Sequence, residues 1–420
     1  MGRLLFFVVP LLLLTSYASI SRSAETEKGR YAIEVVTVDA GRELFARWGH
    51  ISIVVFDRVD KSRTAYNFGT FDFDDPALRF RYALGYLNYW LETVPYGPMI
   101  RYYKIQHRGV ISRTLHLTET QTEEVVRRLE TNALPENRTY AYRHYLDNCC
   151  TRIRNLLNNV LGGAIKKQFD TEPTGRSYRY YTRRALKGLP VMRNVILFIL
   201  GRPIDIPVTR WDEQFLPEVF GEDLDTVTIG PDHTPLVSDR RVFLEQTGPK
   251  VGEATSNVEV AIFSTYSVLL ILGLAIPIVF SKKRWSWTRR LAGLGIFLWG
   301  FLAGFGGLLV IFLWTATVHY DCHSNENVLV FPVLHLWLIG PAMKLLIKGK
   351  LGARTNLWLQ RYLIGATVLL AVNLLLKLGP FFQKNYEFIG VAAVMNIAVI
   401  LVLRGLSITE KKQLDEKRST

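Results

Sequence analysis

Two residues in the first half of the chain, His50 and Cys149, have the types that a thiol hydrolase or acyltransferase needs. A cysteine nucleophile requires a nearby base, usually histidine, and the two can lie far apart in sequence because the fold brings them together. His50 opens a strand-like run, and Cys149 follows Asp147 and Asn148 where a helix is expected to begin. Each residue could equally serve packing alone, so the pairing depends on the elements that hold them.

The elements around His50 predict an α+β domain. Residues 31–38, 50–57 and 65–71 alternate apolar and polar side chains, as half-buried strands do. A helix is expected to follow Thr118, because Thr118 and Gln121 have the spacing of a capping box ahead of an apolar stripe.

A papain-like site also needs a third residue that orients the imidazole ring. Asn67 lies in the strand-like run that follows His50 and is our first candidate. Asp72 and His144 are its rivals, and Asn67 could equally be an ordinary strand-end residue.

A second helix is expected from Cys149, with apolar side chains at helical spacing over residues 153–161 and a stop at Gly162. Asp147 or Asn148 is the natural N-cap, which places Cys149 in the first turn. The N–H groups and the positive dipole end of a helix lower the pKa of a thiol and can bind an oxyanion. We therefore expect a reactive thiolate at Cys149.

The chain changes character near residue 257, after which long apolar runs follow one another. A transmembrane helix needs about 20 apolar residues. The sequence predicts five membrane spans, at residues 260–280, 291–317, 328–347, 357–378 and 388–403.

Charge asymmetry predicts how these spans are oriented, because basic loops are retained in the cytoplasm. The loops 282–290 and 344–361 and the tail after Arg404 are rich in Lys and Arg, whereas 319–327 and 379–387 are not. All five spans then give one topology, in which the C-terminus lies in the cytoplasm and the first half of the chain lies outside it. We expect a multi-pass protein of the bacterial inner membrane with a periplasmic domain.

The N-terminus predicts a secretory signal, because Arg3 precedes an apolar run at residues 4–14 and then small residues. An uncleaved anchor is the alternative. The net charge of +14 is explained by anchoring at anionic lipids, and no nucleic-acid motif calls for another partner. The expected organisation is a signal at 1–24, a periplasmic domain at 25–256 (core 31–165, extension 166–256), five spans within 257–405 and a tail at 406–420.

The chain has three cysteines, all expected on the oxidising side of the membrane. A structural disulfide is the default there, and Cys150 with Cys322 is one pairing that would leave Cys149 free. A bridge between the adjacent Cys149 and Cys150 would be strained. The sequence does not choose among the pairings.

The outer loop 319–327 and the third span carry histidines that could support the site. His319 and His323 flank Asp321 in the loop, and His335 lies inside the span, where histidine is uncommon. The loop could face the thiol site, and His335 could border a lipid access path. The loop residues are too crowded for a closed zinc site, so we expect neither a metal nor another cofactor.

Four ordered motifs resemble the Lnb-type N-terminal periplasmic domain family. They are Glu43-Leu-Phe-Ala-Arg-Trp-Gly-His50, Tyr66-Asn-Phe-Gly-Thr-Phe-Asp-Phe73, Pro135-Glu-Asn-Arg-Thr-Tyr140, and Asp147-Asn-Cys149 followed by Thr151 and Arg152. The match spans about residues 31 to 160, and members of the family typically continue into a multi-span membrane region, as this chain does. The doubled Cys149-Cys150 is a departure, since a small residue usually follows the Asn-Cys pair.

This resemblance implies a lipoprotein N-acyltransferase, which moves an acyl chain from a membrane phospholipid to the amino group of the lipidated N-terminal cysteine of a diacylated lipoprotein. It also implies a circularly permuted papain-like fold, similar to the NlpC-type and lecithin:retinol acyltransferase relatives. Catalytic roles then fall on Cys149, His50 and Asn67. The supporting candidates are Asp147, Asn148, Cys150, Arg152, Asp72 and His144.

Two other functions remain open. A periplasmic cysteine amidase or peptidase acting on the cell wall could use the same pair of residues, although five membrane spans would exceed its needs. A lipid-binding or transport protein without catalysis would not need His50 or Cys149 at all.

Overall fold

A computed structural model describes residues 29–72, 76–248, 250 and 286–419 of the chain. The first part is built on a seven-stranded antiparallel sheet with strand order β11-β5-β1-β2-β3-β4-β6. The strands are β1 (Tyr31–Val38), β2 (His50–Asp57), β3 (Ser62–Thr70), β4 (Asn88–Pro95), β5 (Val110–Leu115), β6 (Thr139–Ala141) and β11 (Val237–Leu244).

The first two expected strands have the bounds that their alternation predicted, whereas β3 begins earlier and ends sooner than expected. The ladder between β2 and β3 runs only from Asp57–Ser62 to Ile53–Tyr66. The two strands therefore part before they reach His50, which opens one end of the sheet.

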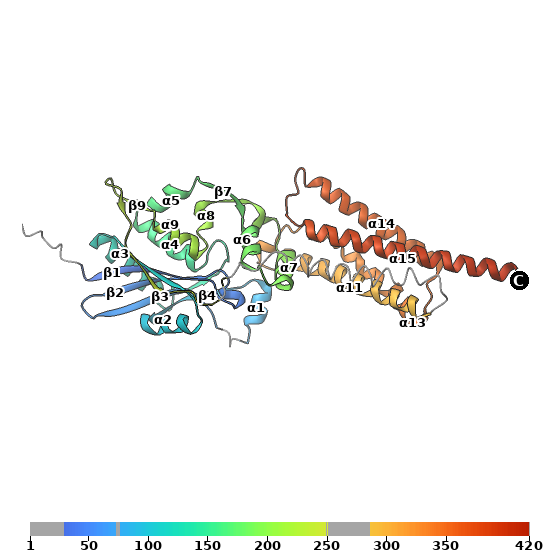
Figure 1. Cartoon of the computed structure of the whole chain (residues 1–420), viewed down its shortest axis with the longest axis horizontal. Coiled ribbons are helices and arrows are strands. Elements are labelled where there is room, and N and C mark those ends of the chain that lie inside the picture. The colour runs from blue at the N-terminus through green and yellow to red at the C-terminus, as the bar shows by residue number, and fades with distance from the viewer. Residues whose placement is uncertain (1–28, 73–75, 249, 251–285, 420) are drawn as a thin grey trace, which may run out of the picture.

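Helices cover both faces of this sheet (Figure 1). On one face α3 (Glu119–Ala133) and α4 (Cys149–Val160) pack over a core of aliphatic side chains, and on the other lies α2 (Tyr96–Ile105). The capping box of Thr118 and Gln121 is present at α3. The expected α+β architecture is confirmed.

The segment after α4 contains the short helices α5 (Ala164–Phe169), α6 (Tyr178–Ala185), α7 (Pro190–Ile199), α8 (Arg210–Glu213) and α9 (Pro217–Leu224). It also contains the 3-10 turn η2 (Arg202–Asp205) and two short strand pairs, β7 (Pro173–Ser177) with β8 (Pro207–Thr209) and β9 (Thr228–Ile229) with β10 (Thr234–Pro235). Earlier in the chain lie the 3-10 turn η1 (Leu44–Ala46) and the helix α1 (Leu78–Leu84). The sequence did not indicate that β11 returns to the main sheet as its edge strand beside β5.

Four helical segments of the described chain are long and apolar enough to cross a membrane: Trp287–Thr315, Asn327–Lys348, Ala353–Leu376 and Tyr386–Ser407. They correspond to the last four expected spans, and the first expected span, at 260–280, lies outside the described residues, as does the expected signal. The helices are α11 (Ser286–Thr315), α12 (Asn327–Val330), η4 (Val333–Leu338), α13 (Ile339–Lys348), α14 (Ala353–Leu376) and α15 (Tyr386–Ser419). The second segment is therefore interrupted near Pro332, where the chain cannot continue an α-helix.

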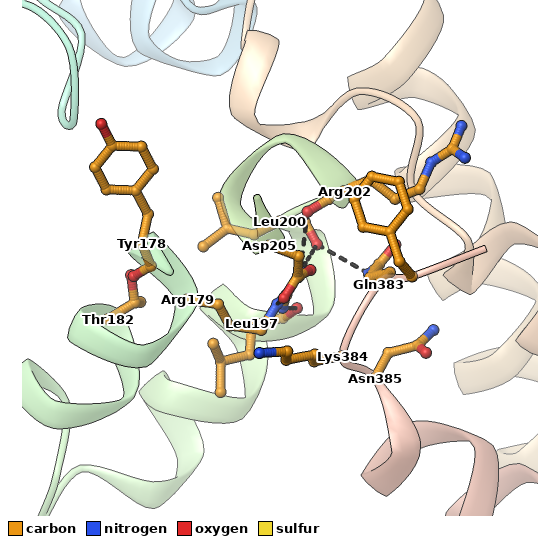
Figure 2. A network of polar contacts seen from close by, with 12 residues as sticks. Tyr178, Arg179, Thr182, Leu197, Leu200, Arg202, Asp205, Gln383, Lys384 and Asn385 are labelled. Atoms are coloured by element: carbon orange, nitrogen blue, oxygen red, sulfur yellow. Dashed lines mark hydrogen bonds and ion pairs between the residues drawn. The ribbon is translucent and has the colours of Figure 1, made fainter. Parts of the chain in front are cut away.

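A joint of buried polar groups connects the two parts at the C-terminal end of α7 (Figure 2). Arg179 of α6 forms a fully buried ion pair with Asp205 at 2.8 Å and donates to the Leu197 and Leu200 carbonyls. From the loop before α15, Gln383 donates to the same Leu200 carbonyl at 3.0 Å.

The loop after α11 completes this joint. Asn325 donates to the carbonyls of Phe198 and Ile199 at 3.0 and 2.9 Å. The last carbonyls of a helix have no partner inside it, so these side chains satisfy groups that α7 alone would leave open. The sheet domain is thus fastened to the outer loops of the membrane helices.

Candidate active site

His50 begins β2 at the open end of the sheet, on the face that α2 covers. Its Nε2 lies 3.2 Å from Asn67 Oδ1, which accepts a hydrogen bond. The Ser52 hydroxyl donates to the same Oδ1 and fixes it. Because Nε2 carries the proton in this contact, the neutral ring has its lone pair on Nδ1. Nδ1 is then the nitrogen that can take a proton from a nucleophile.

The structure pairs Asn67 with His50, rather than either rival. Asp72 has an exposed side chain. The His144 ring packs into an aromatic cluster, with its centroid 4.5 Å from that of Trp48 and 4.7 Å from that of Tyr145. Burial among these rings lowers the pKa of His144 to about 4, so this side chain is a neutral packing residue.

Cys149 is the first residue of α4, and Asn148 is its N-cap, as the sequence predicted. Asn148 Oδ1 accepts hydrogen bonds from the N–H groups of Cys150 and Thr151, both at 2.9 Å. Its Nδ2 donates to the carbonyls of His144 and Phe215, each at 2.9 Å. One side chain therefore ties the helix start to the segment before it and to the extension.

The Cys149 thiol lies against the edge of β2, where the sheet has opened. The backbone N–H of Ile51, the residue after His50, donates toward its sulfur, as do the N–H groups at the helix start. On the side of β3, Gly69 has φ of 96°, and a Cβ there would lie 3.7 Å from that of Cys149. The end of β2, the bend of β3 and the start of α4 thus meet around one thiol.

Protonation states at this site follow from burial. Burial raises the pKa of Cys149 to about 11, although backbone N–H groups of Ile51, Cys150 and Cys149 oppose the shift. Burial likewise lowers the pKa of His50 to about 4, although the bond to Asn67 opposes it. The expected thiolate is therefore wrong for this structure, because burial favours a neutral thiol at Cys149 and a neutral imidazole at His50 near neutral pH. The sequence analysis considered the effect of the helix dipole on the thiol pKa, but not the stronger effect of desolvation.

The two adjacent cysteines have different surroundings. Cys150 is fully buried in the core with Ile153 and Leu157, whereas Cys149 is only partly buried and packs at the edge of that core. Cys322 lies in the 3-10 turn η3 (Tyr320–Cys322), buried near Tyr145. All three thiols are free, so the expected disulfide is wrong. Each of the two buried thiols faces apolar neighbours instead of another sulfur.

Arg108 is a residue near the site that the sequence analysis missed. The residue is 6% exposed, and its guanidinium donates to the Asp39 carbonyl at 2.7 Å and lies 5.1 Å from the Tyr103 ring centroid. Within the described chain its Nη2 has no hydrogen-bond partner. The positive charge of Arg108 also lowers the pKa of His50, although burial of the ring has the larger effect. Nothing in the local sequence marks Arg108, because it reaches the site through the fold.

The remaining supporting candidates lie further out. Arg152 binds Asp147 through two contacts of 2.5 and 2.7 Å, one turn beyond Cys149. In the outer loop, His319 Nε2 is 2.7 Å from the Tyr82 carbonyl, and His323 Nε2 is 3.0 Å from the Thr317 carbonyl. In the described part of the chain, no cluster of three metal-binding side chains forms.

His335 is fully buried inside the membrane helices. Its Nε2 lies 3.1 Å from Asn396 Oδ1, and its Nδ1 lies 2.9 Å from the Tyr362 hydroxyl. Trp299 donates to the same Asn396 oxygen at 3.0 Å. These bonds join all four described membrane segments, and the ring is enclosed rather than exposed at the bundle surface.

Residues 26–187 match the family model of the Lnb N-terminal periplasmic domain. This range contains His50, Asn67 and Cys149, so the candidate site lies within the matched domain, and the apolar helices follow it. Neither a curated protein nor a solved structure matches the chain.

Proposed function

From the Lnb-type domain that residues 26–187 form, we propose that this protein is a lipoprotein N-acyltransferase that works through a thioester on Cys149. The observation that carries the proposal is that the Cys149 thiol at the start of α4 lies against Ile51 of β2, the residue next to the His50 that pairs with Asn67. A nucleophile, a base and a residue that orients the base are the parts of a thiol acyl-transfer site. The proposal includes a circularly permuted papain-like fold, which the order of the His50 strand before the Cys149 helix supports.

The first half-reaction transfers an acyl chain to the enzyme. Nδ1 of His50 accepts the thiol proton while the Cys149 sulfur attacks the ester carbonyl of a membrane phospholipid. The N–H groups of Ile51 and Cys149, which face the sulfur, stabilise the oxyanion. When the C–O bond breaks, His50 returns the proton to the leaving oxygen. The products are an acyl-Cys149 thioester and a lysophospholipid.

The second half-reaction releases the acyl chain to the acceptor. The free amine of a diacylated lipoprotein attacks the thioester carbonyl, and a new C–N bond replaces the C–S bond. His50 accepts a proton from the amine and passes it to the departing sulfur, which restores the thiol. The acyl donor supplies the energy for transfer, so no nucleotide is required.

Contacts between the sheet domain and the membrane helices support a site close to the membrane. Phe198 of α7 packs against Phe331 and Phe388 of the helical bundle, with ring centroids 5.2 and 5.4 Å away. We assign the sheet domain to the periplasm and the C-terminus to the cytoplasm, which follows from the basic loops. The thiol is then held near the outer leaflet, where both the phospholipid and the lipoprotein anchor are found.

The direct test is to trap the thioester. Full-length protein is reconstituted with a phospholipid that carries one isotope-labelled acyl chain, without acceptor, and the Cys149 peptide is analysed by mass spectrometry. We expect a hydroxylamine-sensitive labelled acyl group and an equal amount of lysophospholipid, both lost in Cys149→Ala. Cys150→Ala is the matched control and should keep both. If the donor is present and neither the acylated Cys149 peptide nor lysophospholipid forms, the proposal is refuted.

A further inference from the structure

A polar pocket lies along α4, beyond the turn that carries Cys149. Its volume is about 490 Å³, and its polar lining includes Arg128, Arg143, Arg152, Asn132, Asn155 and Asn159. The proposed thiol chemistry uses none of these side chains. The pocket joins α3, α4 and the segment that precedes α4.

The charge of the pocket favours an anion. Three arginines line it, of which Arg152 is bound to the Asp147 carboxylate and Arg128 to the Glu124 carboxylate, so the third, Arg143, carries the excess positive charge. In the described chain, the Arg143 guanidinium makes neither a hydrogen bond nor an ion pair, and it stacks 5.2 Å from the Tyr320 ring centroid. Guanidinium groups and side-chain amides together suit the tetrahedral oxygens of a phosphate.

The pocket is connected to the thiol through α4 and β3. Along α4 the pocket is lined by Arg152, Leu156 and Asn159, whose spacing keeps them near the helix face that carries Cys149. Each residue adds about 1.5 Å of rise along the helix axis. On the other side, Phe68 lines the pocket and immediately precedes Gly69, which faces Cys149. The residues that line the pocket thus adjoin Cys149 along α4 and Gly69 along β3.

One side chain of the pocket contacts the membrane part of the protein. Arg143 lines the pocket, and its guanidinium stacks over Tyr320 in the loop that follows the membrane helix α11. Burial raises the pKa of Asp321 in the same loop, and the charge of Arg143 opposes that shift. The pocket is thus joined through Arg143 to the loop next to the membrane helices.

From this geometry we propose that the pocket binds the phosphate of the donor phospholipid headgroup and thereby places an acyl ester at Cys149. The inference deepens the proposed function and rests on it. In a glycerophospholipid only a few bonds separate the phosphate from the acyl esters, which matches a phosphate site one or two helical turns from the nucleophile. Binding energy from the headgroup would then orient the ester for attack.

The first arm measures binding without catalysis, in full-length Cys149→Ala protein in detergent. The probes are a short-chain phosphatidylglycerol, the matching diacylglycerol, which lacks phosphate, and inorganic phosphate. We expect phosphatidylglycerol to bind more tightly than diacylglycerol, and Arg128→Gln with Arg143→Gln to weaken only the former, by about tenfold or more.

The control pair, Arg127→Gln with Arg138→Gln, removes the same charge outside the pocket. Arg127 shares the Glu124 carboxylate with Arg128 but does not line the pocket. The control pair of substitutions should leave phosphatidylglycerol binding nearly unchanged. An equal loss of phosphatidylglycerol affinity in both pairs would overturn the proposal. Inorganic phosphate that binds as tightly as phosphatidylglycerol would also overturn it, because the pocket would then be a site for free phosphate.

The second arm separates this inference from the proposed function. Acylation of Cys149 is measured with phosphatidylglycerol and with a phosphate-free activated ester, each with and without the Arg128→Gln and Arg143→Gln pair. We expect a higher KM for the phospholipid and an unchanged rate with the ester. If neither donor acylates the native protein, the proposed function fails while the binding result stands. If acylation proceeds and the arginines do not affect phospholipid KM or binding, the headgroup site fails alone.

Discussion

At Cys149, two effects on the thiol oppose each other, and burial outweighs the backbone N–H groups. Because its pKa is raised to about 11, Cys149 should react slowly with iodoacetamide at neutral pH, and the rate should rise throughout the range from about pH 6 to pH 10. The measurement is the alkylation rate of the Cys149 peptide at each pH. A rate already constant from about pH 5 upward would indicate a preformed thiolate–imidazolium pair and contradict this protonation state.

The acid limb of activity should follow His50. Burial lowers its pKa to about 4, and the base must be neutral to accept the thiol proton, so acylation should persist as pH falls below 6.5 and decline only as it approaches about 4. The pH profile of the acylation rate tests this, with His50→Gln as the inactive control. A decline centred near 6.5 would mean that the ring is solvated during catalysis.

Asn67 should act through His50 rather than on substrate. Asn67→Ala removes the acceptor at 3.2 Å that sets the tautomer, and it should lower the acylation rate about tenfold or more while leaving donor KM unchanged. Ser52→Ala removes only the hydroxyl that holds Asn67 and should have a smaller effect. A rise in KM with an unchanged rate would show that Asn67 contacts the substrate instead.

At the scale of elements, the Asn148 side chain makes most of the cap hydrogen bonds at the start of α4, and Thr151 completes the capping box. Asn148→Ala removes two accepted and two donated hydrogen bonds, so it should cost about 2 kcal/mol or more of stability and also reduce acylation. Thr118→Ala breaks the capping box of α3, far from the thiol, and should cost about 1 kcal/mol without loss of activity. Thermal unfolding and acylation rate are measured together. Equal activity in the two variants would deny the cap a role in positioning Cys149.

The local parts of these elements could be predicted from the sequence. Strand alternation gave the bounds of β1 and β2, and the residue preferences of caps placed Thr118 and Asn148 correctly, because both signals act over a few residues. What could not be predicted depends on distant contacts. The sequence near β11 does not show its pairing with β5, and nothing near Arg108 indicates that it lies close to His50.

The same limit applied to the thiol. A helix start raised the expectation of a low pKa, but the degree of burial is set by neighbours from several elements. Which of the two adjacent cysteines lies in the core could be decided only from the fold, because Cys150 is buried there and Cys149 lies at the edge of β2.

For the whole molecule, the buried joint at α7 should keep the sheet domain in one position over the membrane. Gln383→Ala removes the donor to the Leu200 carbonyl inside this joint and should increase hydrogen exchange at the end of α7. Phospholipid turnover should fall, whereas alkylation of Cys149 by iodoacetamide should not change. Arg183→Gln breaks a partly exposed ion pair with Glu387 at the same junction and should alter less. Unchanged exchange in Gln383→Ala would show that the joint does not depend on this contact.

The central claim is that the molecule acylates lipoprotein amines through Cys149. Mass spectrometry of lipoprotein N-terminal peptides tests it most directly, in cells that lack the chain and have no other such acyltransferase, and in the same cells complemented with the native chain or Cys149→Ala. We predict that the amide-linked acyl group disappears without the chain, returns with the native chain and does not return with Cys149→Ala. Amine acylation that persists in the deletion strain, or that Cys149→Ala restores, would contradict the account.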